Sequence, residues 1–478
     1  MASRSKVLKA GMGYSIGNML IRGIAFISTP IFTRVLTTND YGLYSTFVSY
    51  ESILAMVIGL CLHSSIKSAN IEYPGKLDDY ASAVCSFQVV LLVVSIAIWG
   101  ISGAVGFDPL EIGKVPALLM IINGFASSII LVYNSYLSIS YEYKKYLTLS
   151  FISSFGNIIF SLLLIFTIFK NQRYVGRIAG TAVAAALVGF IVLKMLFSKR
   201  RPRLTKDYIK FGISYSLPII PHGLSQVILA QFGKIIVQRV VGNSEAGIFG
   251  FAYTIALIPQ VLGTSLDTAW GPWFYENFKR DNEVVKKRAL QYLLLFSILI
   301  IGINTFSAEA VYILGSKAYW DAIYIVPSAV LSMYFLFLYY FPSSIEYYEK
   351  KTKFIALGSM LAALLNIALN YVCVRKFGYE AASYVTLATY VVYFLLHVFI
   401  AGRLSKFPFD IAKMSSVILI TCGVTALDII FIKNILIRIA ILLLVSALLY
   451  FMNRTTIMEA VQMLSIKPKG KKAEERET

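Results

Sequence analysis

Two cations lie deep inside long apolar stretches of the sequence, where a charged side chain costs about 2.5–3.5 kcal/mol or more in a membrane. Arg22 stands at the centre of the first stretch, and Lys234 lies in a later one. On a helical wheel Asn18 shares a face with Arg22, and Gln231 and Gln238 share a face with Lys234. An Arg guanidinium binds phosphate through two parallel hydrogen bonds, and a Lys ammonium adds a point charge. This pattern predicts a cationic cavity lined with amides that binds an anion.

Three further charged residues belong to the same candidate site. Arg34 and Arg239 stand at the outer ends of the two stretches, as ligands at the rim of the cavity or as anchors of the helix ends. Glu51 is the only acid that its repeat unit places near the middle of the membrane. It is either the counter-ion of Arg22 or a carboxylate for a coupling ion, H⁺ or Na⁺.

No pattern indicates catalysis or a bound cofactor. The 3 histidines and 4 cysteines lack metal-ligand spacing. Motifs for phosphate-binding loops, zinc hydrolases and serine hydrolases do not occur. We therefore expect no metal, no cofactor and no enzymatic activity.

The composition is that of a membrane protein. Of 478 residues, 58% are hydrophobic and 14% are charged, whereas soluble proteins carry about 25% charged residues. The net charge of +19 comes from 44 Lys and Arg against 25 Asp and Glu. With the N-terminus inside, most of these basic residues fall in inside segments, as the positive-inside rule requires. The positive net charge thus reflects the membrane topology of the chain, and no nucleic-acid partner is expected.

Positioning these residues requires a set of membrane-spanning helices, each with about 20 mainly apolar residues. The sequence predicts 14 such spans, and we expect an all-α integral membrane protein of the cytoplasmic membrane with both termini cytoplasmic. In the seventh span, Pro218 and Pro221 predict a kink or an unwound segment. The predicted spans are 11–34, 43–66, 80–103, 115–139, 147–169, 175–197, 209–238, 246–269, 289–313, 321–345, 354–374, 379–402, 411–432 and 435–452.

An internal repeat organises the spans. Residues Arg34–Tyr44 match Arg239–Phe249 at an offset of 205 residues, and Arg34, Val35 and Gly42 are identical to their counterparts. The first and seventh spans run in the same direction, so the repeats are parallel, an arrangement that places substrate near the midplane between the halves. We predict two six-helix lobes, 1–205 and 206–408, an extra helix pair at 409–452, and a basic cytoplasmic tail at 453–478 that lies on anionic membrane lipid.

Three segments resemble bacterial polysaccharide flippases of the O-antigen and capsule repeat-unit type, within the multidrug/oligosaccharidyl-lipid/polysaccharide exporter superfamily. They are the stretch from Gly13 to Tyr44, the stretch from Lys234 to Phe249, and Trp270-Gly-Pro-Trp-Phe274. Members of this family commonly have an Asp immediately before the lysine of the seventh span, whereas this chain has Gly233 there, so coupling through that position is in doubt.

The resemblance implies that the protein moves an undecaprenyl-pyrophosphate-linked oligosaccharide across the membrane by alternating access. The diphosphate would bind in the cationic cavity at Arg22, Arg34, Lys234 and Arg239. A polymerase or glycosyltransferases of the same pathway are possible partners.

Other functions stay open on the sequence alone. One is a flippase for the peptidoglycan precursor lipid II, from the same superfamily. A second is a drug/cation antiporter, against which the excess of cations over acids at membrane depth argues. A third is a membrane glycosyltransferase or polymerase, for which no outer loop is long enough.

Overall fold

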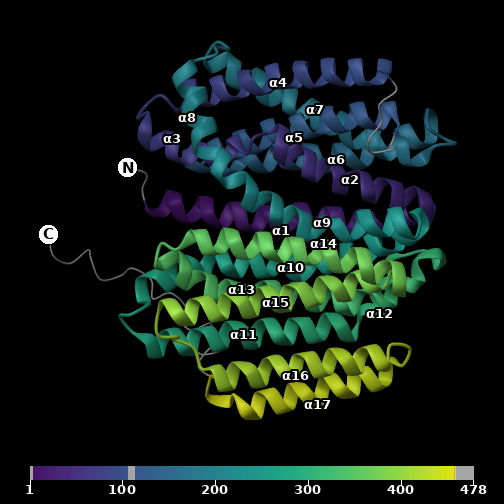
Figure 1. Ribbon diagram of the computed structural model, residues 1–478, viewed down its shortest axis with the longest axis vertical. Coiled ribbons are helices and arrows are strands. Elements are labelled where there is room, and N and C mark those ends of the chain that lie inside the picture. The colour runs from purple at the N-terminus through teal and green to yellow at the C-terminus, as the bar shows by residue number, and fades with distance from the viewer. Residues whose placement is uncertain (1–3, 106–112, 457, 459–478) are drawn as a thin grey trace, which may run out of the picture. The chain divides into compact units, whose positions relative to one another are not determined.

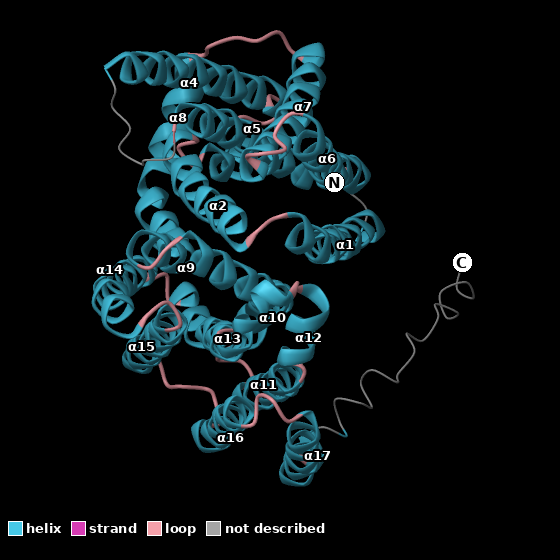
Figure 2. Ribbon diagram, turned by 90° about the vertical axis from the view of Figure 1, so that its right-hand side faces the viewer, coloured by secondary structure: helices cyan, strands magenta, loops and turns pink. Residues whose placement is uncertain are grey.

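A computed structural model of the chain describes residues 4–105, 113–456 and 458, and every element in these ranges is helical (Figures 1 and 2). In the first helix, the side chains of several residues, Asn18 and Arg22 among them, lie outside this description, as does nearly all of the predicted tail. The predicted all-α fold is confirmed for the described residues.

The chain forms two compact units. Unit 1 comprises residues 1–255, 311–325 and 353–393, and unit 2 comprises 256–310, 326–352 and 394–478. The predicted lobe boundary near residue 205 stays a prediction.

The helices of unit 1 are α1 (Arg4–Val35), α2 (Thr38–Ile58), α3 (Ile66–Glu72), α4 (Leu77–Val105), α5 (Lys114–Ser140), α6 (Tyr143–Thr167), α7 (Arg173–Lys199), α8 (Lys206–Ser216) and α9 (Ile220–Val240). Most of α14 (Thr352–Phe377) also belongs to unit 1. Three short 3₁₀ segments, Leu62–Ser65, Leu217–Ile219 and Lys317–Tyr324, complete the unit.

Unit 2 contains α11 (Asn282–Thr305), α13 (Val326–Tyr348), α16 (Ile411–Ile430) and α17 (Ile435–Met452). Three helices continue from one unit into the other: α10 (Asn243–Asn277), α12 (Ser307–Leu314) and α15 (Ala381–Leu404). In unit 2, α13 is almost entirely buried, with α11 and α16 packed against it.

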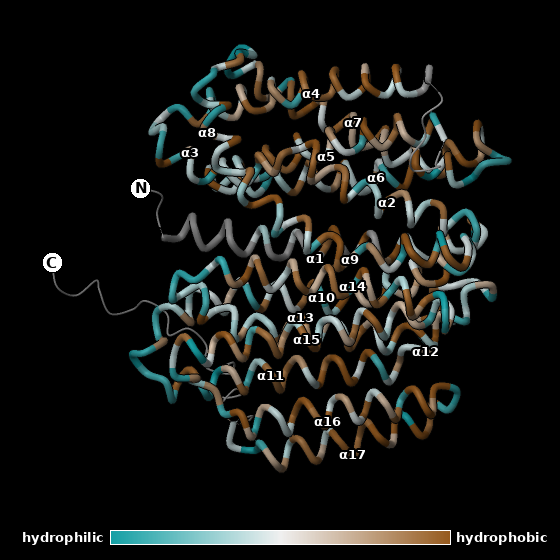
Figure 3. Tube along the Cα trace, viewed as in Figure 1, coloured by the Kyte–Doolittle hydropathy of each residue, from teal (hydrophilic) through white to brown (hydrophobic). Residues whose placement is uncertain are grey.

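Ten predicted spans each lie largely on one helix, whereas the second, seventh, ninth and tenth each extend over more than one helical segment, the seventh over α8 and α9. Eleven of the described helices are long and apolar enough to cross a membrane, or up to 13 if two bent pairs each form one span. The protein is therefore a multi-pass membrane protein, and the count of 14 stays a prediction. Figure 3 shows the apolar residues along the middle of the helices and the hydrophilic residues in turns and at helix ends.

Small residues let the helices of unit 1 approach closely. A Cβ atom at Gly180 of α7 would lie 2.3 Å from the backbone of Ser161 in α6, and one at Gly17 of α1 would lie 1.8 Å from Leu147. The packing requires glycine at position 180, because the opposing atoms are backbone, whereas at position 17 the Leu147 side chain would have to move. The spacing of small residues in Gly13/Gly17 and Gly176/Gly180 is typical of such helix–helix contacts.

The two glycines that the repeat aligns face each other in the structure. A Cβ atom at Gly42 of α2 would lie 1.7 Å from the carbonyl oxygen of Asn243, and one at Gly247 of α10 would lie 2.1 Å from that of Thr38. The two contacts are reciprocal, as expected where two copies of one motif pack around a local twofold axis. Thr37 begins α2 with a capping box, in which its hydroxyl accepts a hydrogen bond from the Asp40 amide at 3.1 Å.

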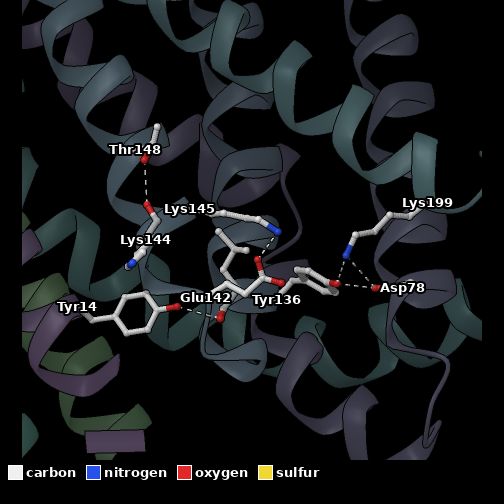
Figure 4. A network of polar contacts seen from close by, with 9 residues as sticks. Tyr14, Asp78, Tyr136, Glu142, Lys144, Lys145, Thr148 and Lys199 are labelled. Atoms are coloured by element: carbon white, nitrogen blue, oxygen red, sulfur yellow. Dashed lines mark hydrogen bonds and ion pairs between the residues drawn. The ribbon is translucent and has the colours of Figure 1, made fainter. Parts of the chain in front are cut away.

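At the end of unit 1 that is predicted to be cytoplasmic, basic residues take part in a polar network (Figure 4). The Lys199 ammonium donates to the Tyr136 hydroxyl at 2.8 Å, and that hydroxyl donates to Asp78 at 2.5 Å. Lys145 forms an ion pair with Glu142. These cations therefore take part in contacts between helix ends of unit 1.

Candidate functional site

The candidate site is built on α9 and α2, which pack against each other within unit 1. The proline-rich entry to α9 differs from the expected unwound segment, because a 3₁₀ turn at Leu217–Ile219 joins α8 to α9 without a gap. Pro218 and Pro221 occupy the first positions of the 3₁₀ turn and of α9. Proline is tolerated there because the backbone N–H groups of a first helical turn have no partner within the helix.

Gln231 links the predicted cation to α2. The Lys234 ammonium donates a hydrogen bond to the Gln231 side-chain carbonyl at 3.1 Å, and the Ser49 hydroxyl donates to the same oxygen at 3.1 Å. Ser49 is fully buried, whereas Lys234 and Gln231 are half-buried. The sequence-predicted pair of Gln231 and Lys234 thus lies together, one turn apart on one face of α9.

Lys234 has no acidic partner among the described residues. Its hydrogen-bond partner is a neutral amide, and no described carboxylate lies within ion-pair distance of its ammonium. A buried charge is stable only when a counter-charge or several hydrogen bonds compensate for lost hydration. The arrangement therefore suits an anionic ligand that brings the missing charge.

Glu51 follows Ser49 by two residues on α2, so the helix turns its side chain to a different face. It forms no hydrogen bond or ion pair with any described side chain. The two roles predicted for Glu51, as counter-ion of Arg22 or as coupling carboxylate, stay predictions. Arg22 and Asn18 belong to the side chains that the structure leaves outside its description.

The remaining predicted ligands lie at helix ends. Arg239, which is exposed, donates from Nε to the Tyr50 hydroxyl at 2.9 Å and so also connects α9 to α2. Gln238 donates to the Asn243 side chain at 3.0 Å, in the turn after α9. Arg34 is exposed and donates to two backbone carbonyls, those of Pro30 at 2.8 Å and Ile313 at 3.2 Å. Among the described residues, no hydrogen bond joins Gln238 or Arg34 to Lys234.

Ser49 and Tyr50 are site residues that the sequence analysis did not select. The Ser49 hydroxyl also lies 3.0 Å from the Ser45 carbonyl one turn earlier, so its single proton is shared between that oxygen and Gln231. Ser49 faces α9, whereas Ser45 lies against Gly250 of α10. The i, i+4 spacing of these serines, directly after the repeated motif, is the signal that could have identified them.

Arg177 and Arg438 are buried cations that lie within predicted spans and that the sequence analysis did not select as site residues. In α7, Arg177 is 8% exposed, bonds Ser161 at 2.7 Å and Asn157, and lies over the Phe32 ring at 3.7 Å. In α17, Arg438 is 1% exposed and forms two hydrogen bonds with Glu309, at 2.6 and 3.0 Å. Glu309 compensates the charge of Arg438. The partners of Arg177 are neutral side chains and aromatic rings, so its charge, like that of Lys234, has no acidic partner among the described residues.

Residues 7–278, more than half of the chain, match a protein family described as polysaccharide biosynthesis protein. A curated relative, Lsg locus putative protein 1 of Haemophilus influenzae, is 23% identical over 386 residues, which cover 76% of this chain and 90% of the relative.

Two solved structures share the fold. Lipid II flippase MurJ in an inward closed conformation aligns with a TM-score of 0.73 and 18% identity, over 93% of this chain and 99% of its own. An inward-facing multidrug resistance transporter of the MATE family, within the MOP superfamily, aligns with a TM-score of 0.60 and 14% identity, over 82% of this chain and 98% of its own. At such identities the likeness concerns the fold alone.

Proposed function

The chain belongs to the polysaccharide biosynthesis protein family, and we propose that it is a flippase that moves a lipid-linked oligosaccharide repeat unit across the cytoplasmic membrane. The expected resemblance to this family is thereby confirmed. The carried lipid is proposed to be undecaprenyl pyrophosphate, with alternating access as the mechanism. Its partners would be the substrate itself, membrane lipid, and a polymerase or glycosyltransferases of the same pathway.

One observation carries the proposal. Lys234 holds a positive charge inside a helix of the predicted membrane region, and its described polar partner is the neutral side chain of Gln231. A diphosphate supplies negative charge and several acceptor oxygens, which Lys, Gln and Ser side chains can bind together. The saccharide and the polyprenyl chain would then be carried by the rest of the cavity and by the surrounding lipid.

The proposal assigns graded roles to the other predicted ligands. Arg22, which is predicted to share the cavity, would be a second phosphate ligand, with Asn18 beside it. Arg34 and Arg239 are exposed at helix ends and would attract the anionic headgroup before it enters. Gln238 would act at the rim of the site, since its amide bonds Asn243. Glu51 is the proposed position for coupling to H⁺ or Na⁺.

The test replaces Lys234 by Gln in a strain whose own repeat-unit flippase has been deleted. We expect Lys234→Gln to abolish surface polysaccharide, with accumulation of the lipid-linked repeat unit and an unchanged protein level. The matched control is Lys194→Gln, because Lys194 also lies within a predicted span of unit 1 but is exposed on α7. Normal surface polysaccharide in the Lys234→Gln strain would overturn the proposal.

A lipid II flippase is a second candidate, favoured by the structural similarity to MurJ over nearly the whole chain. Both substrates carry a polyprenyl diphosphate, so the same cationic site would serve. Complementation separates the two: rescue of a strain depleted of its essential lipid II flippase supports the second candidate. A drug/cation antiporter, despite the shared fold with a multidrug transporter, is disfavoured because Lys234 would repel a cationic substrate.

A further inference from the structure

A second buried polar cluster lies in unit 2, where the C-terminal helix pair meets α11. Four of its side chains are at most 1% exposed, and they come from the end of α11 and from α16: Asn304, Thr305, Thr425 and Asp428. The Asn304 amide donates to the Thr425 hydroxyl at 2.9 Å, and the Thr305 hydroxyl lies 3.5 Å from Asp428 Oδ2. Because Thr425 and Asp428 are three residues apart, both face α11 from one side of α16.

Arg438 of α17 borders this cluster, but its charge is already matched. Its guanidinium bonds both carboxylate oxygens of Glu309, at 2.6 and 3.0 Å, and also donates to the Thr305 carbonyl. Bidentate pairing of this kind is the strongest form of an Arg–carboxylate interaction. Arg438 and Glu309 together carry no net charge, so Asp428 leaves the group one negative charge in excess.

The excess charge is accompanied by oxygens without partners. Asp428 is 0% exposed, and its Oδ1 atom has no hydrogen-bond partner among the described residues. The same holds for Oδ1 of Asn304, which stands beside Thr305. A buried, ionised carboxylate with an unpaired oxygen is very unfavourable, so such a group takes up a proton or a cation.

We propose that Asp428 binds a small monovalent cation, Na⁺ or a proton, between α11 and α16. Carboxylate, amide and hydroxyl oxygens are the ligands that hard cations prefer. Asp428, Asn304, Thr305 and Thr425 supply this set. One bound positive charge brings the cluster with Arg438 and Glu309 to neutrality, and a divalent ion would overshoot it. The site is independent of the diphosphate-binding role proposed for Lys234.

The charge that acts on Asp428 from α17 is that of Arg438, which is already bonded to Glu309 of α12. No hydrogen bond or ion pair joins Glu309 to Asp428 among the described residues. From α11 the neighbours are the uncharged Asn304 and Thr305. On α13, Tyr334 bonds Ser297 and lies near Thr421. Thr421 and Cys422 are about two turns of α16 away from Asp428. Lys433 in the following turn is exposed.

The experiment measures the thermal midpoint of the purified full-length protein in detergent while NaCl replaces choline chloride at constant ionic strength. If Na⁺ is the ligand, we expect a saturable rise of about 5 °C at a concentration near 100 times the dissociation constant. Asp428→Asn should lose this response, and Thr425→Val should require roughly tenfold more Na⁺, equivalent to a lost ligand. KCl in place of NaCl tests selectivity.

The proton arm of the same experiment varies pH in choline chloride. If a proton is the ligand, NaCl has no effect, and the wild-type midpoint falls as pH rises because the buried carboxyl loses its proton. This fall should be absent from Asp428→Asn. Glu283→Gln is the matched control for both arms, since its side chain is an exposed acid of unit 2 (85% exposed).

Identical Na⁺ and pH responses in the wild type and Asp428→Asn would overturn the proposal and assign Asp428 to the ion-pair network of Arg438. A second measurement covers the case in which Asp428→Asn does not fold. Saturable binding of one ²²Na⁺ per wild-type chain supports Na⁺. No such binding, together with a wild-type midpoint that does not change with pH, overturns the site for both ions.

Discussion

Lys234 in unit 1 and Arg438 in unit 2 are both cations in predicted membrane helices, but their surroundings differ in one decisive respect. The Arg438 guanidinium is almost fully buried and bonds both oxygens of Glu309. The Lys234 ammonium is half-buried and bonds the neutral Gln231. On the proposed function, this difference separates a charge that the protein itself pairs, at Arg438, from a charge that is left for a ligand, at Lys234.

The chemistry of the two side chains fits this difference. A planar guanidinium forms a directed, two-point contact with a carboxylate, which holds α17 to α12 within unit 2. An ammonium on a flexible stem forms adaptable single hydrogen bonds. It can therefore exchange its protein partner for a phosphate oxygen with little rearrangement.

The largest expected effect comes from giving Lys234 the acid partner that Arg438 already has. Gln231→Glu places a carboxylate one turn before Lys234, so the two should form an ion pair. We expect transport of the lipid-linked substrate to fall by about 100-fold, because removal of a charge-assisted contact costs about 1.5–3 kcal/mol and the new acid also repels phosphate. Transport is measured as substrate reaching the outer leaflet.

The control for this change is Gln231→Ala, which removes the amide without adding charge. It should reduce transport only several-fold, because Lys234 keeps its charge. Equal activity of Gln231→Glu and the wild type would contradict the idea that uncompensated charge at Lys234 matters.

The next effect concerns stability, and it tests the other half of the comparison. Glu309→Gln leaves the buried guanidinium of Arg438 without its bidentate partner, so we expect unfolding free energy to fall by about 3 kcal/mol. Denaturation of the purified protein in detergent measures the loss. The double variant Glu309→Gln/Arg438→Met should recover part of it, because no buried charge is then unpaired. A double variant less stable than Glu309→Gln alone would be evidence against a pair that acts as a unit.

A smaller effect is expected at the exposed rim. Arg34→Gln removes a cation whose described partners are backbone carbonyls. Exposed charges contribute up to about 1 kcal/mol, so transport should fall about fivefold or less. Higher salt should reduce the difference between wild type and variant, since screening weakens attraction of an anionic substrate. A loss as large as that of Lys234→Gln would instead place Arg34 at the centre of the binding site.

The smallest effect concerns two acids of unit 1, Glu380 directly before α15 and Asp321 in the 3₁₀ segment before α13. Both lie outside the helices long enough to cross a membrane, although the predicted spans 379–402 and 321–345 include them. Burial, and then the nearby Asp321, raise the pKa of Glu380 above its ordinary value. A raised pKa in the folded state means that the stabilising contribution is present at low pH and is lost as pH rises through that pKa. The thermal midpoint should therefore decline slightly as the pH rises above the ordinary pKa of a Glu carboxyl. Glu380→Gln should flatten that decline. An unchanged pH profile in Glu380→Gln would show that the two acids do not interact.

Much of the fold could be predicted because its signals are local in the sequence. Most predicted spans fall on a single helix, since a run of apolar residues is enough to specify a membrane helix. The glycine pairs of α1 and α7 sit at close helix contacts, as their spacing indicates. The contact of Gln231 with Lys234 could also be predicted, because residues three apart lie on one face of a helix.

Other parts of the site could not be predicted. The kink expected at Pro218 and Pro221 is a 3₁₀ turn without a gap, because both prolines occupy positions where a helix tolerates them. Arg177 lies near the start of the predicted span 175–197, and the sequence does not reveal that it is buried between α6 and aromatic rings of α1 and α2. A one-dimensional pattern locates a charge along the chain and says nothing of what surrounds it.

The sequence by itself determined that this is a multi-pass helical membrane protein, which family it belongs to, and where its cations stand along the helices. Only the tertiary structure decided which of those cations are neutralised. Ser49 and Gln231 are 182 residues apart, and Arg438 and Glu309 are 129 apart. Hydrophobicity acts on each helix separately, whereas an ion pair exists only once packing has brought two distant helices within about 3 Å of each other.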